Sequence, residues 1–294
     1  MTAAKRPPIS GFYEILFFTH AMKGYHRPSS IFTNSVEFKS IHPNYISMND
    51  WIQGQVVGKH QWANDLYSLQ INADIQPFLA GQFTRLALDI DDQKVARPYS
   101  FVNPPDQQPL EFYFITLPDG PLTMRLIRLE IGDKVWIMPR AAGFFTLSEV
   151  PDADYLWLLA TGTALGVFLS IVRTPEPWKR FKKVILVHAV RTVDELTYQD
   201  EIKSLYIKYP RQFQMIPFVS REDTDFAIKG RIPQAIEDGR LESRAGIPLT
   251  AQASQVMICG NPDMVRDTRL VLERRGLKKN KRREPGQITV ENYW

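Results

Sequence analysis

The sequence has very little cysteine, which limits the chemistry that the chain can do with its own atoms. Cys259 is the one cysteine among 294 residues. A single thiol cannot close an internal disulfide, and it cannot by itself hold an iron–sulfur cluster, which needs several thiolates. Electrons that this protein handles must therefore reside on another cofactor or leave for another molecule. No metal site is predicted.

Long apolar runs are also missing. The longest candidates, residues 155–160 and 184–187, have the length of a strand, whereas a membrane helix needs about 20 apolar residues. Residues 15–18 are too short for the apolar core of a signal peptide, and Glu14 lies beside them. We therefore expect a soluble, cytoplasmic protein without a membrane partner.

Excess charge of one sign is nearly confined to the start of the chain. The formal net charge is +4, and residues 1–47 contribute +3 of it through five basic and two acidic side chains. The remainder is close to neutral, so the charge is poor evidence for a nucleic-acid partner, and none is predicted. One basic cluster, residues 278–283, remains and is interpreted as a solvated helix end.

Short strands and turns are expected from residue 49 to residue 150. The β-rich segments are residues 53–57, 66–71, 83–90, 111–116 and 134–138. Turn signals separate them, including the Leu-Pro-Asp-Gly sequence at 117–120. This pattern predicts a small antiparallel barrel, to which we assign residues 48–150.

After Pro151 the sequence alternates between strands and helices. The predicted strands are residues 155–160, 184–190, 213–219 and 255–259, and the predicted helices are residues 167–173, 193–206, 233–238 and 264–275. Such alternation predicts an α/β domain with a parallel sheet over residues 151–294. Ligands of these sheets bind at the carboxyl ends of the strands, so we expect the chemistry directly after each strand.

The first of these strands runs into a glycine-containing turn, Thr161 to Gly166. Glycine lets a backbone approach a phosphate closely, and a helix start offers free N–H groups to an anion. The turn has neither the three spaced glycines of a dinucleotide fingerprint nor the lysine of a P-loop. A tight turn that binds no ligand would have the same sequence.

Arginines follow three successive strands: Arg191, Arg221 and Arg231. In dinucleotide-binding sheets an acid near this position binds the ribose of NAD, whereas arginine accommodates the extra phosphate of NADP. Any one arginine is more often a surface residue. Three at one sheet edge could converge on a dianion by bidentate hydrogen bonding, which favours NADP.

Two other segments offer polar groups to a ligand. Strand alternation places Arg97 and Tyr99 on one face and Ser100 on the other. These side chains could bind a pyrophosphate, stack on a planar heterocycle and hydrogen-bond a ring nitrogen, although a strand with a surface arginine and a packed tyrosine fits equally well. Cys259 ends the last strand and is either a buried, inert residue or part of the site.

Taken together, these motifs resemble the bacterial-type ferredoxin/flavodoxin–NADP⁺ reductases. The similarity runs in order and spacing from about Asn49 to the end of the chain. The segments that carry it are residues 97–103, 110–113, 117–120, 141–145, 159–164, 230–233 and 259–267, and the tail Tyr293-Trp294. The resemblance implies an FAD-binding barrel followed by an NADP-binding α/β domain.

The resemblance also implies roles for individual residues. Arg97 meets the FAD pyrophosphate, Tyr99 packs on the flavin, and Ser100 lies near flavin N5. The other residues assigned to FAD are Pro98, Phe112, Gly120, Pro121, Leu122, Thr123, Thr163, Tyr293 and Trp294. The residues assigned to NADP are Val190, Arg191, Ser220, Arg221, Arg231, Gly260, Asn261, Pro262 and Arg266. Ser100 and Cys259, the latter near the nicotinamide, are the predicted catalytic residues.

The function implied by the resemblance is electron transfer between NADPH and a separate ferredoxin or flavodoxin. NADPH delivers a hydride to flavin N5, and the flavin releases electrons singly to the carrier. A monomer is expected, and the basic residues 278–283 are a candidate surface for steering an acidic carrier. Two alternatives remain: a general NAD(P)H flavin or quinone reductase of the same fold, and a flavin-binding module without turnover.

Residues 1–47 lie outside the resemblance, whose members typically begin near Met48. We expect Met48 to be the true start of the protein, with a regulatory extension as the alternative. The intact mass of the protein from its native source distinguishes the two.

Overall fold

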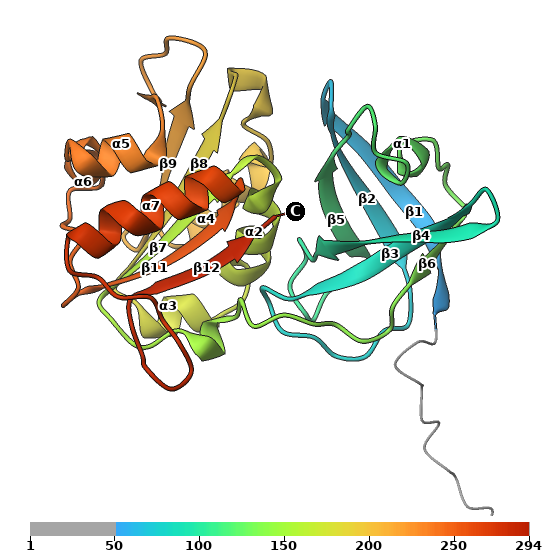
Figure 1. Ribbon diagram of the computed structural model, residues 1–294, viewed down its shortest axis with the longest axis horizontal. Coiled ribbons are helices and arrows are strands. Elements are labelled where there is room, and N and C mark those ends of the chain that lie inside the picture. Colours follow the sequence, from blue (N-terminus) through green and yellow to red (C-terminus); the bar gives the residue numbers. More distant parts are fainter. Residues whose placement is uncertain (1–50, 294) are drawn as a thin grey trace, which may run out of the picture. The chain divides into compact units, whose positions relative to one another are not determined.

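The computed structural model describes residues 51–293. The expectations for residues 1–47, and for Trp294, fall outside this range. Two six-stranded sheets follow one another along the described chain, the first antiparallel and the second parallel (Figure 1).

The first sheet has the strand order β4-β3-β6-β1-β2-β5, and its neighbouring strands are antiparallel. Its strands are β1 (Ile52–Ala63), β2 (Leu66–Asn72), β3 (Phe83–Ile90), β4 (Gln93–Ser100), β5 (Leu110–Ile115) and β6 (Lys134–Ile137). The two end strands approach each other where Phe101, directly after β4, forms an isolated bridge with Phe112 of β5. The sheet thus curls so that its two end strands meet at this one bridge, but no continuous ladder of the described residues closes the expected barrel.

Side chains that point inward from this sheet form a core of their own. It contains Val56, Leu69, Leu86, Phe101 and Phe112, all fully buried. The rings of Phe101 and Phe112 lie 5.4 Å apart, so the bridge that joins the end strands is also part of this core. The short helix α1 (Thr123–Leu126) follows the turn after β5.

The second sheet has the order β10-β9-β8-β7-β11-β12, with every pair parallel. Its strands are β7 (Tyr155–Thr161), β8 (Lys183–Val190), β9 (Phe213–Val219), β10 (Ile228–Lys229), β11 (Ser254–Gly260) and β12 (Ile288–Asn292). The central strands are largely apolar, as expected where helices cover both faces of the sheet. This is the α/β arrangement predicted from the sequence.

The helices divide between the two faces of the parallel sheet. One face packs on α2 (Leu165–Val172), α3 (Glu176–Arg180) and α4 (Gln199–Lys208). The other packs on α5 (Ile232–Glu237), α6 (Arg240–Ala245) and α7 (Pro262–Arg274). The longest of them, α7, has 13 residues, and no helix between residues 51 and 293 combines the length and apolarity needed to cross a membrane.

The helix predicted over residues 193–206 is interrupted. A short 3₁₀ turn covers Val193–Glu195, and α4 begins only at Gln199. Between them Tyr198 has φ 56° and ψ 35°, the left-handed conformation, which a right-handed helix cannot continue through. The fully buried Tyr198 ring lies 4.2 Å from the ring of Trp62, so packing against the first sheet sets this conformation.

Candidate functional site

Two adjoining cavities lie where the strands of the two sheets end. The first, here called the nucleotide cavity, has a volume of about 420 Å³ and lies at the carboxyl ends of β7, β8, β9 and β11. The second, the barrel cavity, has about 400 Å³ and is bounded by β4, β5 and the turn before α1. Both volumes are in the range of small-molecule sites. Ile115, Thr163 and Tyr293 line both cavities, so the two meet at these residues.

The barrel cavity gathers most of the residues that the sequence assigned to FAD. Ten of them line it: Arg97, Pro98, Tyr99, Ser100, Gly120, Pro121, Leu122, Thr123, Thr163 and Tyr293. The Tyr99 ring packs edge-on against Phe114 at 5.8 Å, and burial raises the pKa of its hydroxyl. Two aromatic rings therefore line one wall, and the exposed Arg97, on the same strand as Tyr99, adds a positive charge.

One residue assigned to FAD is placed elsewhere. Phe112 is fully buried in the core of the first sheet and is not among the residues that line the barrel cavity. Phe114, two positions further along the same face of β5, lines the cavity instead. Of the two phenylalanines, Phe114 is therefore the one that a ligand in the barrel cavity could contact. The lining residues that sequence reasoning missed are Phe83, Tyr113, Phe114, Ile115, Leu117, Glu291 and Asn292.

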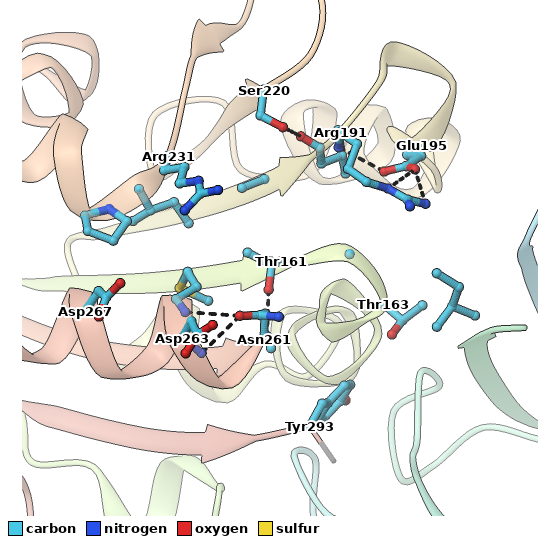
Figure 2. A pocket seen from close by; sticks show the side chains of 18 of the residues that line it. Thr161, Thr163, Arg191, Glu195, Ser220, Arg231, Asn261, Asp263, Asp267 and Tyr293 are labelled. Atoms are coloured by element: carbon cyan, nitrogen blue, oxygen red, sulfur yellow. Dashed lines mark hydrogen bonds and ion pairs between the residues drawn. The ribbon is translucent and has the colours of Figure 1, made fainter. Parts of the chain in front are cut away.

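The walls of the nucleotide cavity are largely backbone turns that follow the strands. Gly260 has φ +135°, and a Cβ there would lie 2.1 Å from the Thr161 hydroxyl oxygen, so only glycine fits. The Thr161 hydroxyl accepts a hydrogen bond from the Asn261 amide at 2.9 Å (Figure 2). The Asn261 side chain in turn caps α7 by accepting from the amides of Asp263 and Met264.

The residues assigned to NADP are brought together only in part. Val190, Arg191, Ser220, Arg231, Gly260 and Asn261 line the nucleotide cavity. Arg221, Pro262 and Arg266 are not among its lining residues. Two of the three expected arginines therefore reach the cavity. Arg221 contributes instead through its backbone amide, which donates to the Arg191 carbonyl at 2.8 Å.

Acidic side chains in this cavity were not foreseen. Asp263 and Asp267 line it and hold the Arg266 guanidinium in ion pairs of 2.7 and 2.8 Å. Glu195 also lines it and pairs with Arg191 at 2.6 Å. In both cases the acid lies within four residues of its arginine on the same segment, which is the sequence signal that could have found these pairs.

Cys259 is covered rather than open to either cavity. Its side chain is fully buried, it lines neither cavity, and burial raises the pKa of the thiol. The Tyr293 amide donates to the Gly260 carbonyl at 3.0 Å, which holds the tail beside the end of β11. Burial also raises the pKa of the Tyr293 hydroxyl. The nearby Cys259 raises it further, and a hydrogen bond with Ser100 lowers it by a smaller amount. The place of Cys259 beside a nicotinamide stays a prediction.

Two buried titratable groups near the cavities have a polar atom without a partner in the described structure. Glu291 lines the barrel cavity, and burial raises the pKa of its carboxyl group to about 7. His188 of β8 donates from Nε2 to the Gly162 carbonyl at 3.0 Å, which leaves Nδ1 unprotonated and unpartnered. Burial lowers the pKa of this imidazole to about 4.

The basic cluster at residues 278–283 lies away from both cavities. Lys279 bridges to Ile288 at the start of β12, which is the opposite end of the parallel sheet from the cavities. Arg282 pairs with Glu149, and Lys281 pairs with Glu284. Two of its five basic side chains, Lys281 and Arg282, are thus engaged in local ion pairs, and the role of the cluster in steering a carrier stays a prediction.

Comparison with known proteins agrees with this geometry. Residues 158–270 match the family described as the oxidoreductase NAD-binding domain. The chain is 48% identical over 248 residues to the flavodoxin/ferredoxin–NADP reductase of Shigella flexneri, and 47% identical over 248 residues to that of Escherichia coli strain K12. Each alignment covers 84% of this chain and 100% of the relative.

A solved structure is similar as well. The ferredoxin NADP⁺ reductase from Neisseria gonorrhoeae, with bound FAD and NADP, is 30% identical and superimposes with a TM-score of 0.79, covering 83% of this chain and 99% of that one. The fold and the two cavities define an oxidoreductase of the two-domain, nucleotide-binding class. Within that class, the chain belongs to the flavodoxin/ferredoxin–NADP reductase family.

Proposed function

We propose that the protein is a cytoplasmic, monomeric reductase that transfers electrons between NADPH and a separate carrier, ferredoxin or flavodoxin, with FAD as its cofactor. The observation that carries this proposal is that the two cavities share Ile115, Thr163 and Tyr293. A ring bound in one cavity would approach a ring bound in the other at these residues. Direct transfer of a hydride requires such an approach.

The barrel cavity fits FAD in the chemistry of its lining. Tyr99 and Phe114 offer aromatic surface to a flat ring system, and Ser100 offers a hydroxyl group at its edge. Arg97 places a cation where a pyrophosphate carries charge, and Gly120 leaves room for the backbone to approach it. When bound, FAD supplies a centre that exchanges a hydride with NADPH and single electrons with a carrier.

The nucleotide cavity fits NADP for similar reasons. Arg191 and Arg231 are the cations that line it, and they suit a phosphate on the ribose. Gly162 and Gly260 both have positive φ angles, so the turns that carry them present backbone rather than side chain to the nucleotide. Because these arginines can bind the 2′-phosphate, the nucleotide cavity favours NADPH over NADH as the electron donor.

The chain's own residues orient the reactants. Tyr293 lies at the meeting point of the cavities and packs against the buried core that contains Cys259. Ser100 and Glu291 line the barrel cavity and present a hydroxyl and a carboxyl group to it. With a pKa of about 7, Glu291 can hold or release a proton there near neutral pH.

Steady-state reduction of purified carriers by NADPH tests the proposal. Ferredoxin and flavodoxin should be reduced with much larger kcat/KM values than a quinone or free flavin. Similar values for all acceptors would support the general flavin or quinone reductase instead. Bound flavin that no nucleotide reduces would support the non-catalytic flavin-binding module.

A further inference from the structure

The Arg191 side chain is already occupied by an acid. Glu195 accepts hydrogen bonds from the Arg191 backbone amide at 2.9 Å and from its Nε at 2.7 Å, and the Nη2 atom lies 2.6 Å from Oε1 of Glu195. Figure 2 shows the guanidinium turned toward Glu195 and away from Arg231. Both carboxylate oxygens of Glu195 are therefore engaged by a single residue.

The two partners differ in exposure. The side chain of Glu195 is only 12% exposed, whereas that of Arg191 is 45% exposed. Glu195 is thus the fixed member of the pair, and Arg191 is the member that solvent or a ligand can reach. Both line the nucleotide cavity, so any anion bound beside Arg191 also lies near the Glu195 carboxylate.

More negative charge lies on the far side of Arg191. This arginine also borders a separate cavity whose lining includes Asp65, Asp194 and Glu222. Asp65 and Asp194 interact with Arg191 through their charge alone, without a hydrogen bond to its guanidinium. Arg191 and Glu195 therefore lie at the border of the two cavities, and the Nε and Nη2 atoms of the arginine are engaged by Glu195.

We propose that Glu195 is a specificity-determining residue that limits the affinity of the protein for 2′-phosphorylated nucleotides by competing with the phosphate for Arg191. This inference rests on the proposed function, in which Arg191 faces that phosphate. A phosphate must either take the guanidinium from Glu195 or bind with a carboxylate beside it. Both routes reduce the net gain from the arginine, whereas a nucleotide without the 2′-phosphate is unaffected.

A limit on affinity has a use in turnover. An enzyme that oxidises NADPH must also release NADP⁺, and both carry the same 2′-phosphate. Product release often limits the turnover number, so a phosphate held too tightly would slow it. Glu195 weakens the hold on the 2′-phosphate, so it speeds the release of NADP⁺ at the cost of part of the preference for the phosphorylated nucleotide.

Calorimetric titration of the FAD-loaded protein with 2′,5′-ADP and with 5′-AMP tests this proposal. The Glu195→Gln variant should bind 2′,5′-ADP about two- to fivefold more tightly, with 5′-AMP binding unchanged. The matched control is Asp194→Asn, which removes a charge from the same loop without removing a hydrogen bond to Arg191. It should change 2′,5′-ADP binding by less than about twofold.

A double-mutant comparison assigns the effect to Arg191. In an Arg191→Ala background, Glu195→Gln should no longer tighten 2′,5′-ADP binding beyond the effect of the Asp194→Asn control. Weaker binding by Glu195→Gln would overturn the inference, since it would mean that Glu195 prepares Arg191 for the phosphate. Equal gains from Glu195→Gln and Asp194→Asn would overturn it as well. Failure of the unsubstituted protein to prefer 2′,5′-ADP over 5′-AMP would overturn the proposed NADP site itself.

Discussion

The Tyr198 hydroxyl donates a hydrogen bond of 2.8 Å to Oε1 of Glu111, which joins the loop before α4 to strand β5 of the first sheet. Directly before it, Thr197 shares a hydrogen bond of 2.9 Å with the Tyr113 hydroxyl. Tyr113 lines the barrel cavity, and the loop that ends at Tyr198 carries Arg191 and Glu195 of the nucleotide cavity. These two contacts therefore fix the loop of residues 191–198 against the barrel.

Replacing Tyr198 by phenylalanine tests the energetic weight of this contact. Burial raises the pKa of Glu111, and the hydrogen bond from Tyr198 opposes that shift. Its loss should raise the folded-state pKa further and cost about 1–3 kcal/mol of unfolding free energy at neutral pH. Because the protonated acid tolerates burial, the loss should shrink as pH falls through the raised folded-state pKa of Glu111.

Urea denaturation at pH 5 and pH 8 measures the Tyr198→Phe effect. The matched control is Tyr113→Phe, whose hydroxyl partner is the neutral Thr197, so its cost should not depend on pH. A Tyr198→Phe cost that is equal at both pH values would contradict the assignment of Glu111 as its charged partner.

Arg97→Ala should weaken FAD binding. A charged hydrogen bond to phosphate contributes about 1.5–3 kcal/mol, so the dissociation constant should rise by about tenfold to a hundredfold. Arg85→Ala is the control, because Arg85 pairs with Pro98 in the β3–β4 register but does not line the barrel cavity. Flavin fluorescence recovery on dilution gives both constants, and equal losses in the two variants would argue against a specific role for Arg97.

Gly260→Ala should damage the nucleotide cavity more than the positive φ angle alone explains. Its new Cβ would lie 2.1 Å from the Thr161 hydroxyl oxygen, which also accepts from the Asn261 amide. Gly276 has φ +86° with nothing within 4 Å of a built Cβ, so Gly276→Ala isolates the conformational cost, about 1–2 kcal/mol. Thermal denaturation should show the larger loss for Gly260→Ala, and NADPH KM should rise in that variant only.

Glu291→Gln should change how stability depends on pH. Burial raises the pKa of Glu291 from 4.5 to about 7, so the folded state prefers the protonated acid. Its contribution to stability is full below pH 4.5 and is lost as pH rises through 7. The variant lacks this loss, so its stability relative to the unsubstituted protein should increase between pH 5 and pH 8, by up to about 1.4 kcal/mol per pH unit.

His188 also affects how stability depends on pH, so the Glu291→Gln variant must be compared with the unsubstituted protein. Its pKa is lowered from 6.5 to about 4, so its contribution is present above pH 6.5 and is lost as pH falls toward 4. This slope opposes that of Glu291 over much of the same range. Because His188 is present in both proteins, its effect cancels in the difference, and a flat difference would contradict the raised pKa of Glu291.

Much of the fold could be predicted because its signals are local. Apolar strands such as β7 and β8 are buried on both faces, and strand–helix alternation indicates a parallel sheet wherever it occurs. Tyr198 shows where local signals fail. The segment around Tyr198 has a helical pattern. Packing against Trp62 and hydrogen bonding to Glu111 nevertheless hold Tyr198 in a left-handed conformation, which cannot be predicted from neighbouring residues in the sequence.

The sequence also indicated part of the lining of the two cavities. The resemblance assigned Arg97, Ser100 and Gly260 to bound nucleotides, and each of them lines a cavity, although strand alternation had placed Arg97 and Ser100 on opposite faces. Phe112 and Phe114 share a strand face, and only the curvature of the sheet decides which one reaches the cavity. Glu195 and Glu291 escaped notice because a carboxylate in an anion-binding or apolar cavity contradicts simple charge matching.

The central claim is that NADPH, rather than NADH, reduces a flavin bound to this protein. Anaerobic titration of the FAD-loaded protein with each nucleotide, followed by visible absorbance, tests it most directly. The account predicts that NADPH bleaches the flavin spectrum at much lower concentration than NADH, and that Arg191→Ala and Arg231→Ala reduce this preference. Bleaching by both nucleotides at the same concentration, or by neither, would contradict it.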